Sequence, residues 1–255
     1  MTLFDCNHSV CGDTIRSMSS TSPVYGRNTS AVAMFLFPLL FIAVFVMHFR
    51  HPGDFFHFRL HYVPRDPVNV VTNLIHAQNR WPLFADPHMI AYLGLPLLPL
   101  CAHALYRLGR TKYPLLSGVA LFVTVSGTIF LGGIFGMWTA FYRGLGNVDP
   151  QYTAGAIATF QGMTAPHGAF MVTTTLGKLA IVGLAIQALT LLGVRGIPRW
   201  AVACVVVGCA IFLVFWDLDN WMLIGVALIM TGFIPAFRTL RNFEGPAAKP
   251  APSAR

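Results

Sequence analysis

The chain has 255 residues, of which 55% are hydrophobic and 10% are charged, and its formal net charge is +8. A composition this apolar, with a mean hydropathy of +0.63, excludes an ordinary soluble domain and indicates an integral membrane protein. In a soluble protein the positive charge would suggest nucleic acid as a partner. Here the basic residues are placed as membrane topology requires, so we predict the lipid bilayer as partner and no nucleic acid.

The first 29 residues are polar and lack the basic start, the short apolar run and the small-residue site of a cleavable signal peptide. We predict a polar cytoplasmic tail over residues 1–29, with translation starting at Met1 or at Met18. The first apolar run is therefore expected to stay in the protein as a membrane anchor.

Six apolar runs follow, and each has about the 20 residues that a helix needs to cross the hydrocarbon core of a bilayer. The runs are continuous and not alternating, which predicts helices, because a helix satisfies its backbone groups within one segment. We predict an all-α fold: a polytopic bundle of six transmembrane helices over residues 30–242, then a disordered tail over 243–255. The runs are residues 30–48, 87–107, 114–142, 167–193, 198–216 and 221–237.

Lysine and arginine are unevenly distributed over the two sides that six crossings define. Eleven lie on the side of the two termini and five on the other side, with Lys178 inside the fourth run. The positive-inside rule then places both termini in the cytoplasm. We therefore predict a multi-pass protein of the bacterial inner (plasma) membrane.

The first outer segment, residues 51–86, is long enough to carry structure of its own. Prolines divide it, and between two of them residues 68–80 place Val68, Val71 and Leu74 on one helical face. We predict a short helix there, lying along the membrane interface.

Prolines and small residues inside the runs predict where the helices bend and where they touch. Pro38, Pro96 and Pro99 each remove a backbone hydrogen bond, which predicts kinks in the first two helices. Small residues four apart are typical of close helix–helix contact in membranes. Such pairs are Gly132 and Gly136 in the third run and Cys204 and Gly208 in the fifth.

Histidine is a common metal and haem ligand, and seven of the nine histidines fall on the predicted outer side. His48, His88 and His167 end or begin three helices at similar depth, so that two of them can approach one ion. We predict His88 and His167 as cofactor ligands, and His48, His51 and His167 as metal ligands. The alternative is that these amphipathic rings line the membrane interface. The single glutamate, Glu244, excludes carboxylate-bridged di-iron and zincin sites.

Three ionisable residues are predicted to act beside the histidines. Asp217 and Asp219 lie in the tight outer turn between the last two helices, where they would hold a cation or relay a proton. The alternative is that Asp219 or Asn220 caps the following helix. Lys178 is a charge well inside an apolar run, which is costly enough to indicate function, with nearby threonines or the two aspartates as partners. The alternative is that its ammonium group reaches the outer surface.

Two short motifs complete the pattern. Residues 165–170 (Ala-Pro-His-Gly-Ala-Phe) put a histidine at the start of the fourth helix, and residues 197–200 (Ile-Pro-Arg-Trp) precede the fifth. Together with the long first outer loop, this order resembles a broad group of uncharacterised six-helix bacterial membrane proteins, over about residues 30–242. The resemblance implies topology and not activity.

The leading hypothesis is a multi-pass inner-membrane protein with an outward-facing His/Asp pocket. The pocket would bind a metal ion, haem or a lipophilic small molecule, with redox chemistry as one use. A second hypothesis is a small-solute transporter, with the kinked helices and Lys178 along its path. A third is a non-catalytic accessory subunit, whose glycine faces pack against a membrane partner or a second copy. The sequence leaves open whether the protein is an enzyme.

Overall fold

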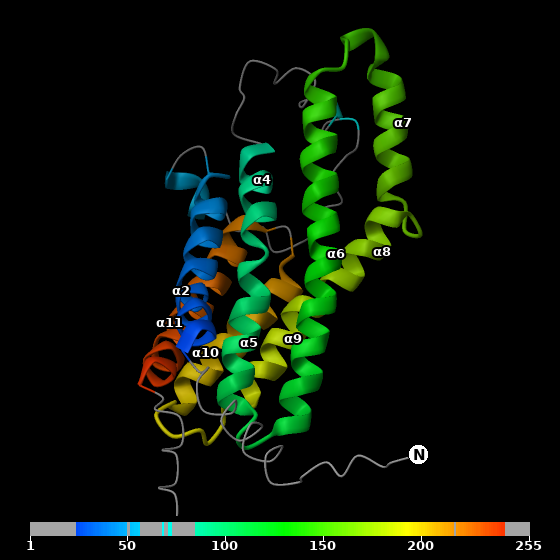
Figure 1. The fold of residues 1–255 in the computed structure, drawn as a ribbon. Coiled ribbons are helices and arrows are strands. Elements are labelled where there is room, and N and C mark those ends of the chain that lie inside the picture. The colour runs from blue at the N-terminus through cyan, green and yellow to red at the C-terminus, as the bar shows by residue number, and fades with distance from the viewer. Residues whose placement is uncertain are drawn as a thin grey trace, which may run out of the picture.

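The computed structural model describes residues 24–49, 52–56, 68, 71–72, 85–216 and 218–242, and these form helices joined by short turns, with no β-strand among them (Figure 1). The all-α class is therefore as predicted. In chain order the helices are α2 (Val24–Val46), η1 (Pro52–Phe56), α4 (Ala85–Gly94), α5 (Leu97–Gly109), α6 (Pro114–Gly146), η3 (Pro150–Tyr152), α7 (Thr153–Thr164), α8 (Ala169–Gly177), α9 (Leu179–Leu189), α10 (Arg199–Val214) and α11 (Asp219–Arg241), where η marks a 3-10 helix.

Five apolar helical stretches are long enough to cross a membrane, by length and composition. The predicted fifth crossing is α10, which is apolar but has only 16 residues, about 24 Å of helix against a hydrocarbon core of about 30 Å. The helical, membrane-type architecture agrees with the prediction, whereas a count of six crossings stays a prediction. The five stretches are Asn28–Val46, Pro87–Gly109, Pro114–Leu145, Ala169–Leu189 and Asp219–Arg241.

The second of these stretches is broken between α4 and α5, where the sequence predicts a kink. Pro96 has no N–H to donate, and in a regular helix its ring would collide with the carbonyl four residues earlier. The chain forms tighter bonds instead: the Leu95 N–H donates to the Tyr92 carbonyl (3.3 Å), and the Leu98 N–H donates to the Leu95 carbonyl (2.9 Å). The carbonyls that the prolines free are thus satisfied within the backbone, as lipid requires. Pro38, in contrast, lies inside an uninterrupted α2.

α6 continues past its predicted end to Gly146 and, paired with α7, projects beyond the other helices (Figure 1). The sequence pattern does not predict α7, because its residues are small or polar as often as they are apolar. Val71, Leu145 and Phe160 form a small buried cluster, so the segment before α4 packs against this pair of helices. Val68, Val71 and Thr72 are helical, and the other residues of the helix predicted over 68–80 lie outside the described residues, so that helix stays a prediction.

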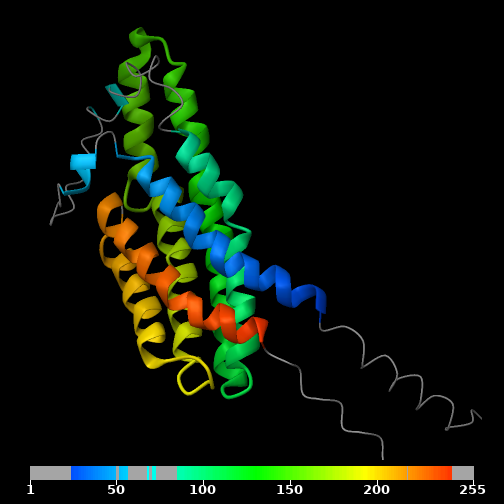
Figure 2. The same cartoon turned by 90° about the vertical axis from the view of Figure 1, so that its left-hand side faces the viewer.

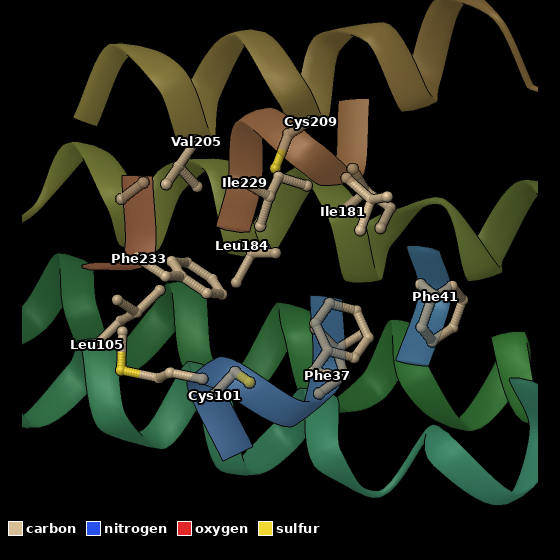
Figure 3. Packing of buried hydrophobic residues seen from close by; sticks show 14 of the residues in the cluster. Phe37, Phe41, Cys101, Leu105, Ile181, Leu184, Val205, Cys209, Ile229 and Phe233 are labelled. Carbon is tan, nitrogen blue, oxygen red and sulfur yellow. The ribbon is translucent and has the colours of Figure 1, made fainter. Parts of the chain in front are cut away.

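The main core lies among α2, α5, α9, α10 and α11, with further buried residues from α4, α6 and α8, and Figure 3 shows side chains of the first five packed together. α2 and α11 run antiparallel and side by side along one face of the bundle (Figure 2). Between α2 and α5, the Cys101 thiol donates to the Ala33 carbonyl at 3.0 Å. This bond satisfies a buried sulfur and a backbone oxygen where two helices meet.

Glycines allow α6 and α9 to touch backbone to backbone. A methyl group on Gly127 of α6 would overlap the backbone of Ala180 in α9. One on Gly183 of α9 would overlap the backbone of Thr124 in α6. Since lipid tails are as apolar as the helices, such van der Waals contact is a main source of helix association in a membrane.

The small residues singled out from the sequence behave in two ways. A methyl group on Gly208 of α10 would lie 2.5 Å from the Gly225 carbonyl oxygen of α11, which confirms a close contact there. Methyl groups on Gly132 and Gly136 of α6 would find their nearest neighbours in α4 and the break that follows it, at 3.7 Å in both cases. A separation of 3.7 Å is ordinary van der Waals contact, so Gly132 and Gly136 have room for a methyl group where Gly127 has none.

We expect Gly127→Ala to destabilise the protein by about 1–3 kcal/mol, because the added methyl group must push α6 and α9 apart. Gly118→Ala is the matched control on the same helix, since nothing lies within 4 Å of its methyl position. It should leave stability unchanged or slightly raised, because alanine favours a helix. Thermal unfolding of both variants in one detergent measures the difference, and equal melting temperatures would contradict the close contact.

Candidate functional site

The helices of the bundle end in two places (Figure 1), and the side chains at the two ends differ. We call the end where α2 stops, α4 starts and α10 turns into α11 the histidine end, because it carries His48 and His88. We call the end where α5 stops and α6 starts the basic end. Besides Arg27 in the first turn of α2, the described lysines and arginines near the basic end are Arg107, Arg110, Lys112, Arg195, Arg199, Arg238 and Arg241.

His48 and His88 meet at the histidine end. His48 comes just after the last residue of α2, and His88 lies in the first turn of α4. Their ring centroids are 5.5 Å apart and the rings are edge to face at 81°. The structure therefore brings together two of the three histidines that the sequence places at similar depth.

A backbone hydrogen bond fixes which nitrogen of His48 is available. His48 Nδ1 lies 2.8 Å from the Val44 carbonyl oxygen, which can only accept, so Nδ1 carries the hydrogen. In the neutral ring Nε2 then has the free lone pair. A histidine held in this way by a carbonyl is a typical metal ligand in proteins.

Aromatic rings surround the pair on the protein side. The His88 ring lies 6.2 Å from Phe135 and 6.4 Å from Trp138, both on α6. The His48 ring lies 6.5 Å from Phe45, which in turn contacts Phe212 of α10 at 5.7 Å. Sequence reasoning missed these aromatic neighbours, because a phenylalanine in an apolar run carries no signal of what it will face. Both histidines are half-buried between this apolar wall and the end of the bundle.

His167 lies apart from the pair, exposed on the turn between α7 and α8. An indirect link runs through Trp138, which contacts His88 and also Phe170, one turn after His167, at 4.8 Å. Within the described ranges no group of three or more His, Cys, Asp or Glu side chains is arranged to hold a metal ion. His51 and Asp217, predicted as metal ligand and acid–base group, lie outside the described residues.

Lys178 lies at the junction of α8 and α9, half-buried. Its Nζ is 5.5 Å from the centroid of the Trp216 ring, in the turn that leads to α11. The ammonium group therefore extends toward the turn between α10 and α11, and its pairing with Asp217 or Asp219 stays a prediction. Asp219 itself is the first residue of α11 and is half-buried.

The threonines near Lys178 serve their own helix. The hydroxyls of Thr173, Thr174 and Thr175 each donate to the carbonyl four residues earlier, at 2.5, 2.8 and 2.9 Å. Bonds of this type satisfy a hydroxyl in an apolar segment and bend the helix that contains it. Three in succession favour a bend where α8 gives way to α9. Each hydroxyl oxygen can still accept a hydrogen bond, so a threonine–lysine pairing stays a prediction.

Asn220 has a role that the sequence does not reveal. Its Nδ2 donates to the Phe55 carbonyl at 3.2 Å, which ties η1 to the start of α11 across 165 residues of chain. The helix begins after Leu218, which forms no side-chain bond at the cap position. Asn220 Oδ1 accepts a hydrogen bond from the Trp221 N–H at 3.1 Å, so Asn220 does satisfy one backbone group in the first turn of α11. An asparagine beside a helix start looks like a cap in sequence, and only the fold shows its distant partner.

Comparison with protein-family models, with curated proteins and with solved structures finds no match to this chain. The resemblance to six-helix bacterial membrane proteins stays a prediction. The chemistry of the histidine end therefore rests on the geometry above.

We expect Asn220→Ala to release η1 from α11, because the Phe55 carbonyl loses its donor. The loss should cost about 1 kcal/mol and speed amide hydrogen exchange in residues 52–56. Asn147→Ala is the control, since its side chain donates locally to the Arg143 carbonyl at the far end of α6. Exchange rates in residues 52–56 that are the same in both variants would show that Asn220 does not anchor this segment.

Proposed function

We propose that this protein is a multi-pass inner-membrane protein that binds a metal ion at the His48–His88 pair on its outward-facing side. The observation that carries the proposal is the 5.5 Å separation of the two ring centroids. Two imidazoles that bind one ion at N–metal distances of about 2.0–2.1 Å, with a tetrahedral to trigonal angle between them, have centroids about 5–5.5 Å apart. The carbonyl-bound Nδ1 of His48, which leaves Nε2 to bind the ion, adds to this support.

The same geometry favours a small ion over haem. A haem iron with two axial imidazoles separates the ring centroids by about 6 Å, with the porphyrin plane between the rings. The edge-to-face contact of His48 with His88 leaves no such plane. Neutral imidazole suits zinc and copper, and copper would give the site a redox use. The aromatic wall also suits a lipophilic small molecule, which is the competing ligand class.

The other predicted residues enter this proposal in secondary roles. A pair of histidines leaves an ion open to further ligands, for which His51 and His167 are the candidates. Asp217 and Asp219 would hold or relay a proton near the site. Lys178 would balance charge in the turn beside Trp216.

We expect the purified full-length protein to bind Zn²⁺ or Cu²⁺, and His48→Ala and His88→Ala each to weaken binding by about tenfold or more, since each removes a ligand. His103→Ala is the control, a histidine near the basic end. Metal content after dialysis and titration calorimetry provide the measurements, and His167→Ala shows whether that residue is a third ligand. Wild-type affinity in both pair variants would remove the proposal, and so would a haem spectrum that both variants retain.

A small-solute transporter is the second candidate, favoured by the two broken crossings. α4 and α5 part at Pro96, and α8 and α9 part at Lys178. Transporters commonly bind their solute at such interrupted helices, near the middle of the membrane. A lysine at one interruption would attract an anion, so this function predicts passage of a small anion beside Lys178.

The transport hypothesis predicts that vesicles containing the protein admit chloride, and that Lys178→Met reduces the initial rate about tenfold, because the cation that attracts the anion is gone. Quenching of a chloride-sensitive dye inside the vesicles gives the rate. Arg195→Met, an exposed cation near the basic end, is the control. Rates equal to those of protein-free vesicles would exclude chloride passage.

A further inference from the structure

At the basic end, α5 gathers its polar side chains on one face. His103, Arg107 and Arg110 follow one another at spacings of four and three residues, which are neighbours on a helix. Tyr106 lies between them: its ring stacks on His103 at 6.3 Å and 29°, and the Arg110 guanidinium carbon is 5.7 Å from its centroid. We call His103, Tyr106, Arg107 and Arg110 the α5 basic face.

A hydrogen bond to α2 holds this face in place. Ser30 is buried, and its Oγ lies 3.2 Å from His103 Nδ1. On α5 itself, Pro99 and Leu100 precede His103 by four and three residues, so they lie on its side of the helix, and both are apolar and partly exposed. The α5 basic face therefore adjoins an apolar surface. A phospholipid could place its headgroup on the basic face and its acyl chains on the apolar surface.

The position along the helix also fits a headgroup. Gly109 ends the span candidate Pro87–Gly109, so Arg107 and Arg110 lie where hydrocarbon gives way to the polar layer. His103 and Arg107 are half-buried and Arg110 is exposed, so the polar groups reach from the bundle toward the surface.

The protein supplies these arginines with no anion in the part of the chain that the structure describes. The aspartate side chains seen there, Asp54, Asp149 and Asp219, belong to η1, the α6–α7 turn and the start of α11 at the opposite end. Lys112, in contrast, donates to the Leu192 carbonyl at 3.2 Å. A half-buried guanidinium group is most stable beside an anion, and arginine binds phosphate through two parallel hydrogen bonds.

We propose that His103, Arg107 and Arg110 bind the phosphate of an anionic phospholipid in the leaflet at the basic end. Arg107 and Arg110 contact the phosphate oxygens, and Tyr106 holds the Arg110 side chain over its ring. The acyl chains lie along the partly exposed Pro99 and Leu100 of α5. This site is independent of the histidine pair, because the two lie at opposite ends of the bundle.

The test is thermal unfolding of the full-length protein in detergent, with dioleoylphosphatidylglycerol or dioleoylphosphatidylcholine added. We expect the anionic lipid to raise the melting temperature of the wild type by about 5 °C over the zwitterionic lipid. The double variant Arg107→Gln/Arg110→Gln should lose this difference. Arg195→Gln/Arg199→Gln, which removes two exposed charges near the same end, should keep it.

Two results would overturn the proposal. The first is that both double variants keep, or both lose, the difference in melting temperature between the two lipids. Either outcome would mean that the basic end attracts negative charge in general. An equal shift with millimolar glycerol phosphate in place of lipid would mean a site for soluble phosphate. If the double variant does not fold, Arg110→Gln is tested alone, because the Arg110 side chain is exposed and is not part of the core. The number of anionic lipids that this variant retains, counted by native mass spectrometry, must then be lower than for the wild type.

Discussion

The contact of α6 with α9 at Gly127 and Gly183 is the interaction on which the other helices depend. In lipid, apolar side chains gain little by leaving their surroundings, so helices associate where their backbones can approach closely. α6 uses this contact to hold α9 on one side, and it packs against α4 and α5 on another. It is also the longest of the described helices, and its far end forms the extension with α7. A shift of α6 would therefore move the helices that pack against it, which are α4, α5, α8 and α9.

The packing of α6 also places the histidine pair. The Phe135 ring contacts Phe41 of α2 at 6.3 Å and His88 of α4 at 6.2 Å, so one residue of α6 touches both helices that carry the pair. The end of α2 and the start of α4 are thereby brought to the same place, although a long outer segment separates them in sequence. The opposite end gathers arginines beside apolar surface. The histidine end of the bundle is thus suited to a metal ion and the basic end to a phosphate group.

Breaks in the helices come from specific side chains rather than from general flexibility. Pro96 lies at the break between α4 and α5, and the threonines of α8 bend the chain before Lys178. At both breaks the backbone groups find new partners within a few residues, which is the condition for an interruption inside lipid. The break at Lys178 also gives the ammonium group its direction, because α9 begins there and the side chain extends to Trp216.

Local chemistry alone predicts much of this protein: apolar runs long enough for membrane helices, the bend at Pro96, the tight contact at Gly208 and the gathering of arginines at one end. Each of these depends on residues near one another in the chain. The pairing of His48 with His88 rather than His167, the bond from Asn220 to Phe55 and the existence of α7 depend on how separate helices tilt and pack. No short stretch of sequence encodes such distances, because they arise from the shapes of several helices fitting together at once.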